Sequence, residues 1–101
     1  MADYVVPRST SEEVVAEIWS ALLGVDQVGV YDDFFDLGGH SLLAMRVVSR
    51  IRDAFEIELP LRSLFEATTV ADLAEVVEAV LLAELEQLSD EEAEYLLSER
   101  Y

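Results

Sequence analysis

The sequence contains no cysteine, only one histidine and few residues that favour turns. Without cysteine the chain can form neither disulfides nor thiolate metal sites, and it has no cysteine nucleophile. His40 is the single histidine, so a metal site built from several histidines is excluded. Two prolines and four glycines among 101 residues are few for a β-rich fold. No segment resembles a signal peptide or a membrane span, so we expect a cytoplasmic protein that holds no metal.

Basic residues are also scarce, and acidic residues greatly outnumber them. Six Lys and Arg stand against 22 Asp and Glu, giving a formal net charge of −16 at pH 7 and a pI near 4.1. This charge disfavours binding to nucleic acid and to anionic membranes, and it favours partners with basic patches. The same acids would also keep a small protein soluble. Hydrophobic residues make up 52% of the chain, enough for the core of one small domain, which we expect to be a monomer.

Apolar residues recur at the spacing of amphipathic helices in three parts of the chain. A Ser-Thr pair precedes the first of these segments and Gly24 follows it, as helix caps do. Trp19 lies on the apolar stripe of this segment, so we assign it to the core rather than to a ligand site. Leu64 and Phe65 are expected to be buried by a single short helical turn. The predicted fold is all-α, a small bundle of three main helices at about residues 11–23, 41–55 and 69–80 with one short helix at 61–65.

A long loop separates the first two predicted helices, from Val25 to His40. A loop of this length in a small domain is usually functional. We interpret its adjacent aromatic residues, Phe34 and Phe35, as anchors that pack into the core. The spacing of its aspartates does not match a calcium-binding EF-hand. We therefore interpret these aspartates as a solvated surface or as partner contacts: Asp32, Asp33 and Asp36.

Ser41 follows two glycines and begins the second amphipathic segment. Gly38 and Gly39 allow the chain to turn sharply just before the helix. Free backbone N–H groups and the positive end of the helix dipole favour an anion at this position. On helix physics alone, the common role of such a serine is that of a helix cap.

The residues from Phe34 to Leu42, FFDLGGHSL, closely resemble the attachment motif of carrier proteins. The Gly-Gly-His-Ser-Leu form is similar to the peptidyl carrier (thiolation) domains of nonribosomal peptide synthetases, and the resemblance extends over about residues 4–80. In that family the matching serine receives 4′-phosphopantetheine from coenzyme A, and the thiol of this arm holds aminoacyl, peptidyl or acyl groups as thioesters. The resemblance implies attachment at Ser41, with Gly39, His40 and Leu42 beside the group.

Other interpretations stay open from the residues alone. An acyl carrier protein of a polyketide pathway is one alternative, although such carriers more often show Asp-Ser-Leu at the motif. A helical protein-interaction module without a prosthetic group satisfies the composition and periodicity equally well. Catalysis by Ser41 and His40 has no support, because the chain lacks both a Gly-x-Ser-x-Gly elbow and a second histidine. We therefore expect a non-catalytic carrier domain with no catalytic residues.

The exposed side of the second predicted helix carries apolar residues close to Ser41. Leu42 lies nearly opposite the apolar core face, Met45 lies well off it, and Arg46 occupies a neighbouring exposed position. Apolar side chains grouped beside a functional serine favour a recognition surface. We expect these residues to contact a phosphopantetheinyl transferase, and adenylation and condensation domains, or a ketosynthase or thioesterase.

The two ends of the chain depart from a minimal carrier. Residues 1–10 resemble the linker that follows an adenylation domain, residues 11–80 form the predicted carrier domain, and residues 81–101 form a helical extension with an acidic tail. Ser89 and Glu92 predict the capping box of a separate short helix. Leu96 and Leu97 would lie on its apolar side and dock into a groove of a downstream subunit. The alternative is a disordered tail.

Overall fold

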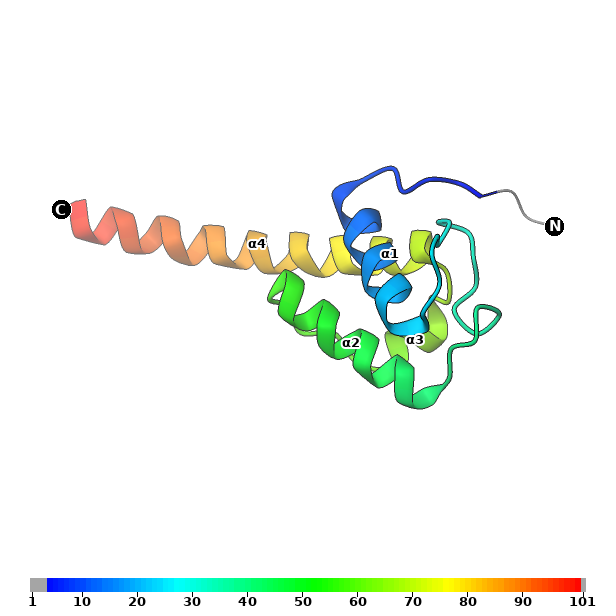
Figure 1. Cartoon of the computed structure of the whole chain (residues 1–101). Coiled ribbons are helices and arrows are strands. Elements are labelled where there is room, and N and C mark those ends of the chain that lie inside the picture. Colours follow the sequence, from blue (N-terminus) through cyan, green and yellow to red (C-terminus); the bar gives the residue numbers. More distant parts are fainter. Residues whose placement is uncertain (1–3, 101) are drawn as a thin grey trace.

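The computed structural model describes the backbone of residues 4–100 and the side chains of residues 4–86. The described residues contain four helices: α1 (Thr10–Leu23), α2 (Ser41–Phe55), α3 (Arg62–Glu66) and α4 (Val70–Arg100). α1 packs against α2 and α4, and α3 packs against α4, while residues 24–40 form a long loop between α1 and α2 (Figure 1). Within the described residues, the only β pairing is an isolated bridge between Asp33 and Thr69. The predicted all-α bundle is confirmed.

The caps of α1 are those that the sequence predicts. Ser9 has an extended backbone, and its Oγ accepts a hydrogen bond from the backbone N–H of Glu12 at 3.2 Å. Gly24 ends the helix with φ of 70°, a left-handed conformation that carries no steric penalty for glycine. The Glu12 carboxylate does not complete a capping box, because its Oε1 accepts instead from the backbone N–H of Arg8 at 2.7 Å. It therefore fixes the segment that precedes the helix.

α4 is one continuous helix, so the prediction of a separate short helix opened by Ser89 is wrong. An N-cap residue needs an extended backbone, whereas the backbone at Ser89 is helical. The neighbouring Leu, Glu and Ala residues are strong helix formers, which outweighs the modest cost of one serine. With 31 residues, α4 extends far beyond the bundle (Figure 1). The side chains of Leu96 and Leu97 lie outside the described residues.

The core lies where α1, α2 and α4 meet under the long loop. Trp19 is completely buried, as predicted, and its ring meets that of Phe34 edge to face with centroids 5.2 Å apart. The apolar face of α2 is buried at Ala44, Val47, Val48 and Ile51. α4 buries the first part of its apolar stripe at Val70, Leu73 and Val77.

Two aromatic residues that were predicted to be buried lie at the surface instead. Phe35 is 37% exposed and Phe65 is 42% exposed, and their rings stack with centroids 5.7 Å apart. Phe34 and Leu64, the residues that immediately precede them, are completely buried. Because the preceding side chain fills the core at each position, the second aromatic ring is directed outward. Stacking then shields part of each ring from water.

Candidate functional site

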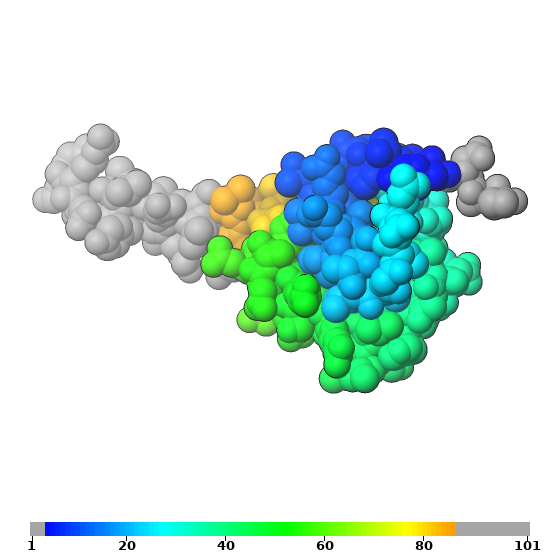
Figure 2. Space-filling model, viewed as in Figure 1, coloured from blue at the N-terminus to red at the C-terminus, as the bar shows by residue number. Residues whose placement is uncertain are grey.

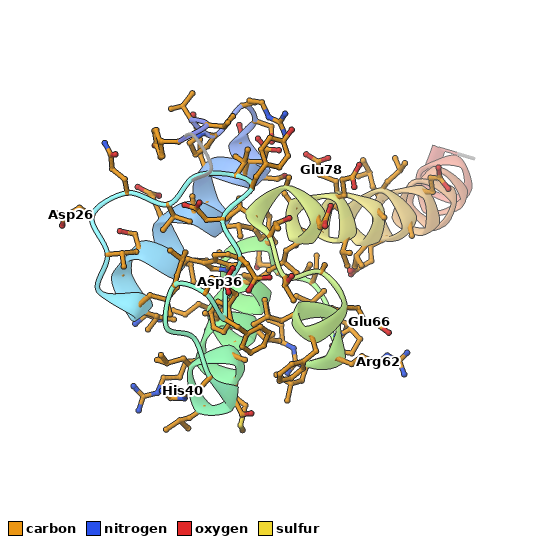
Figure 3. The ribbon with its side chains drawn as sticks, turned by 90° about the vertical axis from the view of Figure 1, so that its right-hand side faces the viewer. Asp26, Asp36, His40, Arg62, Glu66 and Glu78 are labelled. Atoms are coloured by element: carbon orange, nitrogen blue, oxygen red, sulfur yellow. The ribbon has the colours of Figure 1, made fainter. Side chains whose placement is uncertain are left out.

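Ser41 is the first residue of α2 and is exposed at one end of the bundle. His40 occupies the N-cap position with an extended backbone, and its side chain makes no capping hydrogen bond. Ser41 therefore lies one position inside the helix, and the cap role considered for it is wrong. The first N–H groups of a helix lack intrahelical partners, so this end attracts negative charge. Figure 3 shows the labelled His40 at this end of the molecule.

Backbone hydrogen bonds close the turn that leads to Ser41. The N–H of Leu37 donates to the carbonyl oxygen of Asp33 at 3.1 Å, and the N–H of Gly39 donates to that of Phe34 at 3.0 Å. These bonds fold residues 33–39 back on themselves before the helix begins. The position of Ser41 is therefore set by the loop as well as by α2.

Two of the four aspartates in the loop organise its backbone. Asp33 Oδ1 accepts from the backbone N–H groups two and three residues later, at 2.9 and 3.1 Å. Hydrogen bonding from the Thr68 hydroxyl, together with these two bonds, holds the pKa of the Asp33 carboxyl below its ordinary value. Asp32 Oδ2 accepts from the backbone N–H of Gly29 at 2.8 Å. Asp32 and Asp33 therefore also shape the loop, Asp36 is exposed, and partner contacts of these aspartates stay a prediction.

The exposed side of α2 carries the residues that the sequence assigned to recognition. Leu42 and Met45 are each 55% exposed, and Arg46 is exposed as well. Leu42 directly follows Ser41, and the other two residues lie one helical turn further on. Their exposure is confirmed, and their contacts with partners stay a prediction. In Figure 2 the start of α2 and the end of the loop lie together at the lower edge of the molecule.

Three further apolar side chains are exposed in the loop and around α3. Leu61 is 36% exposed, and Phe35 and Phe65 form a stacked pair at the surface. Sequence reasoning did not find this group, because it interpreted Phe35 as a loop anchor in the core and placed Phe65 on the buried side of a short helical turn. No local pattern in the sequence marks either ring as exposed.

The site combines an exposed serine hydroxyl with an exposed apolar surface on the same helix. Among the described residues, no group of three or more His, Cys, Asp or Glu side chains is placed to hold a metal ion. In the same part of the chain, no helix combines the length and apolar character that crossing a bilayer requires. An exposed hydroxyl at a helix N-terminus suits a covalently bound anion such as a phosphodiester.

Known proteins with similar sequences share the region around Ser41. The family model described as the phosphopantetheine attachment site matches residues 13–77. Tyrocidine synthase 3 of Brevibacillus parabrevis is 56% identical over 71 residues, which are 70% of this chain and 1% of that protein. Surfactin synthase subunit 3 of Bacillus subtilis is 50% identical over 72 residues, which are 71% of this chain and 6% of that protein. The chain thus spans only a small part of the length of these relatives.

Solved structures with the same fold are carrier domains as well. A solution structure of a non-covalent extended docking domain complex of the Pax nonribosomal peptide synthetase has a TM-score of 0.79 and 33% identity, and the match covers 93% of this chain and 92% of that one. A peptidyl carrier protein in complex with the phosphopantetheine transferase Sfp and coenzyme A has a TM-score of 0.72 and 42% identity, over 75% of this chain and 99% of that one. Sequence, fold and motif agree, and the chain therefore belongs to the phosphopantetheine-attachment family, as a peptidyl carrier domain of the nonribosomal peptide synthetase type.

Proposed function

We propose that Ser41 is the residue that carries 4′-phosphopantetheine, and that the domain is a non-catalytic carrier of aminoacyl or peptidyl groups. The observation that supports this most directly is the exposed Ser41 at the start of α2, within a motif that the matched residues 13–77 include. When bound, the arm supplies a terminal thiol for thioester formation, which this cysteine-free chain does not have. A tethered substrate meets each catalytic partner at high effective concentration.

The residues around Ser41 fit a group attached at this position. The helix N-terminus favours the negative charge of a phosphodiester. His40 and Leu42 are exposed on either side, so neither covers the serine. Gly39 has no side chain that would obstruct access to the hydroxyl. The protein therefore needs to supply only an accessible hydroxyl and a surface that partner enzymes recognise.

The test is the intact mass of the protein after incubation with coenzyme A and a phosphopantetheinyl transferase. The wild-type chain is expected to gain one phosphopantetheinyl group, and Ser41→Ala is expected to gain none. Ser49→Ala, which changes an exposed serine on the same helix, is the matched control and should be modified normally. Circular dichroism should show that Ser41→Ala keeps its fold, because the serine is not the N-cap. Modification of the alanine variant would refute the assignment.

The sequence also supports a proposal for the domain order and for the partners. Residues 1–10 would connect a preceding adenylation domain to the carrier domain of residues 11–80, which would pass its cargo to a condensation domain in the cytoplasm. One similar solved structure, McyG A-PCP complexed with phenylalanyl-adenylate, has a TM-score of 0.71 and 37% identity, and supports an adenylation partner. The transferase partner is supported by the similar carrier bound to Sfp.

Residues 81–101 would dock onto a downstream subunit. The match to the docking domain complex covers 93% of this chain, and so reaches beyond the carrier domain of residues 11–80. The exposed part of α4 that follows the bundle carries apolar and acidic residues side by side, among them Leu82, Glu84 and Leu85. These residues suit a partner surface that is both apolar and basic.

A further inference from the structure

The two adjacent glycines before Ser41 are needed for different physical reasons. Gly38 has φ of 102°, a left-handed conformation that side chains disfavour, but no heavy atom lies within 4 Å of the position of an added Cβ. Gly39 is not in this region of φ. A Cβ at Gly39 would instead lie closer than 3.0 Å to three ring atoms of Phe34, namely Cδ2, Cε2 and Cζ. The backbone of Gly39 therefore rests directly on the Phe34 ring.

The Phe34 ring is held in place from several sides. It is completely buried, and it meets the rings of Trp19 and Phe35 edge to face, with centroids 5.2 Å away in each case. Its backbone N–H donates to the carbonyl oxygen of Thr68 at 2.7 Å, just before α4 begins. Its carbonyl oxygen accepts from the N–H of Gly39 at 3.0 Å. Because the ring cannot easily move, a side chain at position 39 would displace the turn instead.

We propose that Phe34 and Gly39 are positioning residues that fix the turn before Ser41 and so set where a transferase finds the serine hydroxyl. The backbone of Phe34 is hydrogen-bonded to Thr68, just before α4, and the backbone of Gly39 packs on the Phe34 ring. Ser41 follows Gly39 by two residues, so this packing fixes the start of α2. This inference rests on the proposed attachment at Ser41, and it adds the packing that presents the serine. Glycine is required at position 39 because its backbone contacts the Phe34 ring directly, and not because the chain must be flexible there.

The test compares rates of phosphopantetheine transfer and thermal unfolding for a set of variants. Initial rates are measured with coenzyme A and the Sfp transferase over a range of carrier concentrations. We expect Gly39→Ala to lower kcat/KM by about 10- to 100-fold, since a misplacement of about 1 Å can have effects of this size. Phe34→Leu alone should lower the rate by less than Gly39→Ala does, because it shortens the ring that supports the turn without creating a clash. Adding Phe34→Leu, which removes Cε2 and Cζ, to Gly39→Ala should bring the rate and the thermal stability back to about the level of Phe34→Leu alone.

Gly38→Ala is the matched control, because its cost arises from the backbone and not from the ring. Phe34→Leu should therefore not rescue Gly38→Ala. The inference is refuted if Gly39→Ala is modified as fast as the wild type. It is also refuted if Phe34→Leu fails to rescue Gly39→Ala, or if it rescues Gly38→Ala to the same extent. If Gly39→Ala does not fold, the double variant must fold and be modified, and its failure to do so also refutes the inference. A wild-type chain that is not modified at Ser41 refutes the proposed function, and with it the positioning role.

Discussion

Arg8, Glu12 and Tyr31 form a cluster that holds the N-terminal segment against α1. Arg8 Nη2 lies 2.8 Å from Glu12 Oε2, and Arg8 Nη1 donates to the Tyr31 hydroxyl at 2.8 Å. Further towards the N-terminus, the carbonyl oxygen of Val5 accepts from the N–H of Val30 at 3.0 Å. The part of residues 1–10 that the structure describes is therefore anchored to the carrier fold.

This cluster gives a pH dependence of stability with a definite sign. Hydrogen bonds from Arg8 hold the pKa of the Glu12 carboxyl below its ordinary value. The stabilisation is therefore complete above the ordinary pKa and is lost as the pH falls through the lowered pKa of the folded state. We expect Glu12→Gln to lower Tm at about pH 7 and to have a smaller effect at about pH 3. Thermal unfolding of both proteins across this range tests it, and an equal Tm difference at both pH values would contradict it.

α2 has two faces with separate roles. Its core face, with Val47 and Ile51 completely buried, holds the bundle together. Its outer face, with Leu42 and Met45 half exposed, has no role in the core that would explain apolar residues there. Recognition of this surface by partner enzymes would explain why apolar side chains lie beside Ser41, the proposed attachment residue.

Replacing Met45 with aspartate separates recognition from stability. Because Met45 is 55% exposed, Met45→Asp should change the free energy of unfolding by less than about 0.5 kcal/mol. Transfer of phosphopantetheine to Ser41 should slow by roughly tenfold, which corresponds to a loss of about 1.4 kcal/mol of contact energy. Leu82→Asp is a matched control, because Leu82 is 58% exposed but lies on α4. A large fall in Tm with normal transfer would show that Met45 serves the fold.

Local sequence signals predicted the elements better than they predicted which side chains face outward. Ser9 and Gly24 end α1 through hydrogen bonds and φ preferences that depend on a few neighbouring residues, so the sequence reveals them. The exposure of Phe35 and Phe65 depends on their stacking between the loop and α3, which no local pattern records. Ser41 was found by its motif, whereas the contact between Gly39 and Phe34 appears only in three dimensions.

Charge is distributed unevenly over the molecule. Four of the six basic residues lie on α2 and α3, at Arg46, Arg50, Arg52 and Arg62, while the net charge of the whole chain is −16. α2, which begins at Ser41, is therefore less acidic than the chain as a whole. The part of α4 beyond the bundle shows the opposite character, with Glu84 and Glu86 exposed beside leucines. α2 and the projecting part of α4 would thus attract partners with different surfaces.

Removing residues 89–101 tests whether the end of α4 recruits such a partner. Ser41 and the packing that positions it lie in residues 19–70, so the shortened chain should be modified by the transferase at the wild-type rate. Transfer of the loaded group to a separate downstream subunit should fall, and the advantage of the full chain should shrink as salt screens its acidic residues. If the apolar residues make the contact, the double variant Leu96→Asp and Leu97→Asp should lower transfer as much as the deletion does. If the acidic residues dominate, only deletion of residues 89–101 should lower transfer. Measuring single-turnover transfer at low and high ionic strength distinguishes these outcomes, and equal transfer with and without residues 89–101 would show that the segment does not dock.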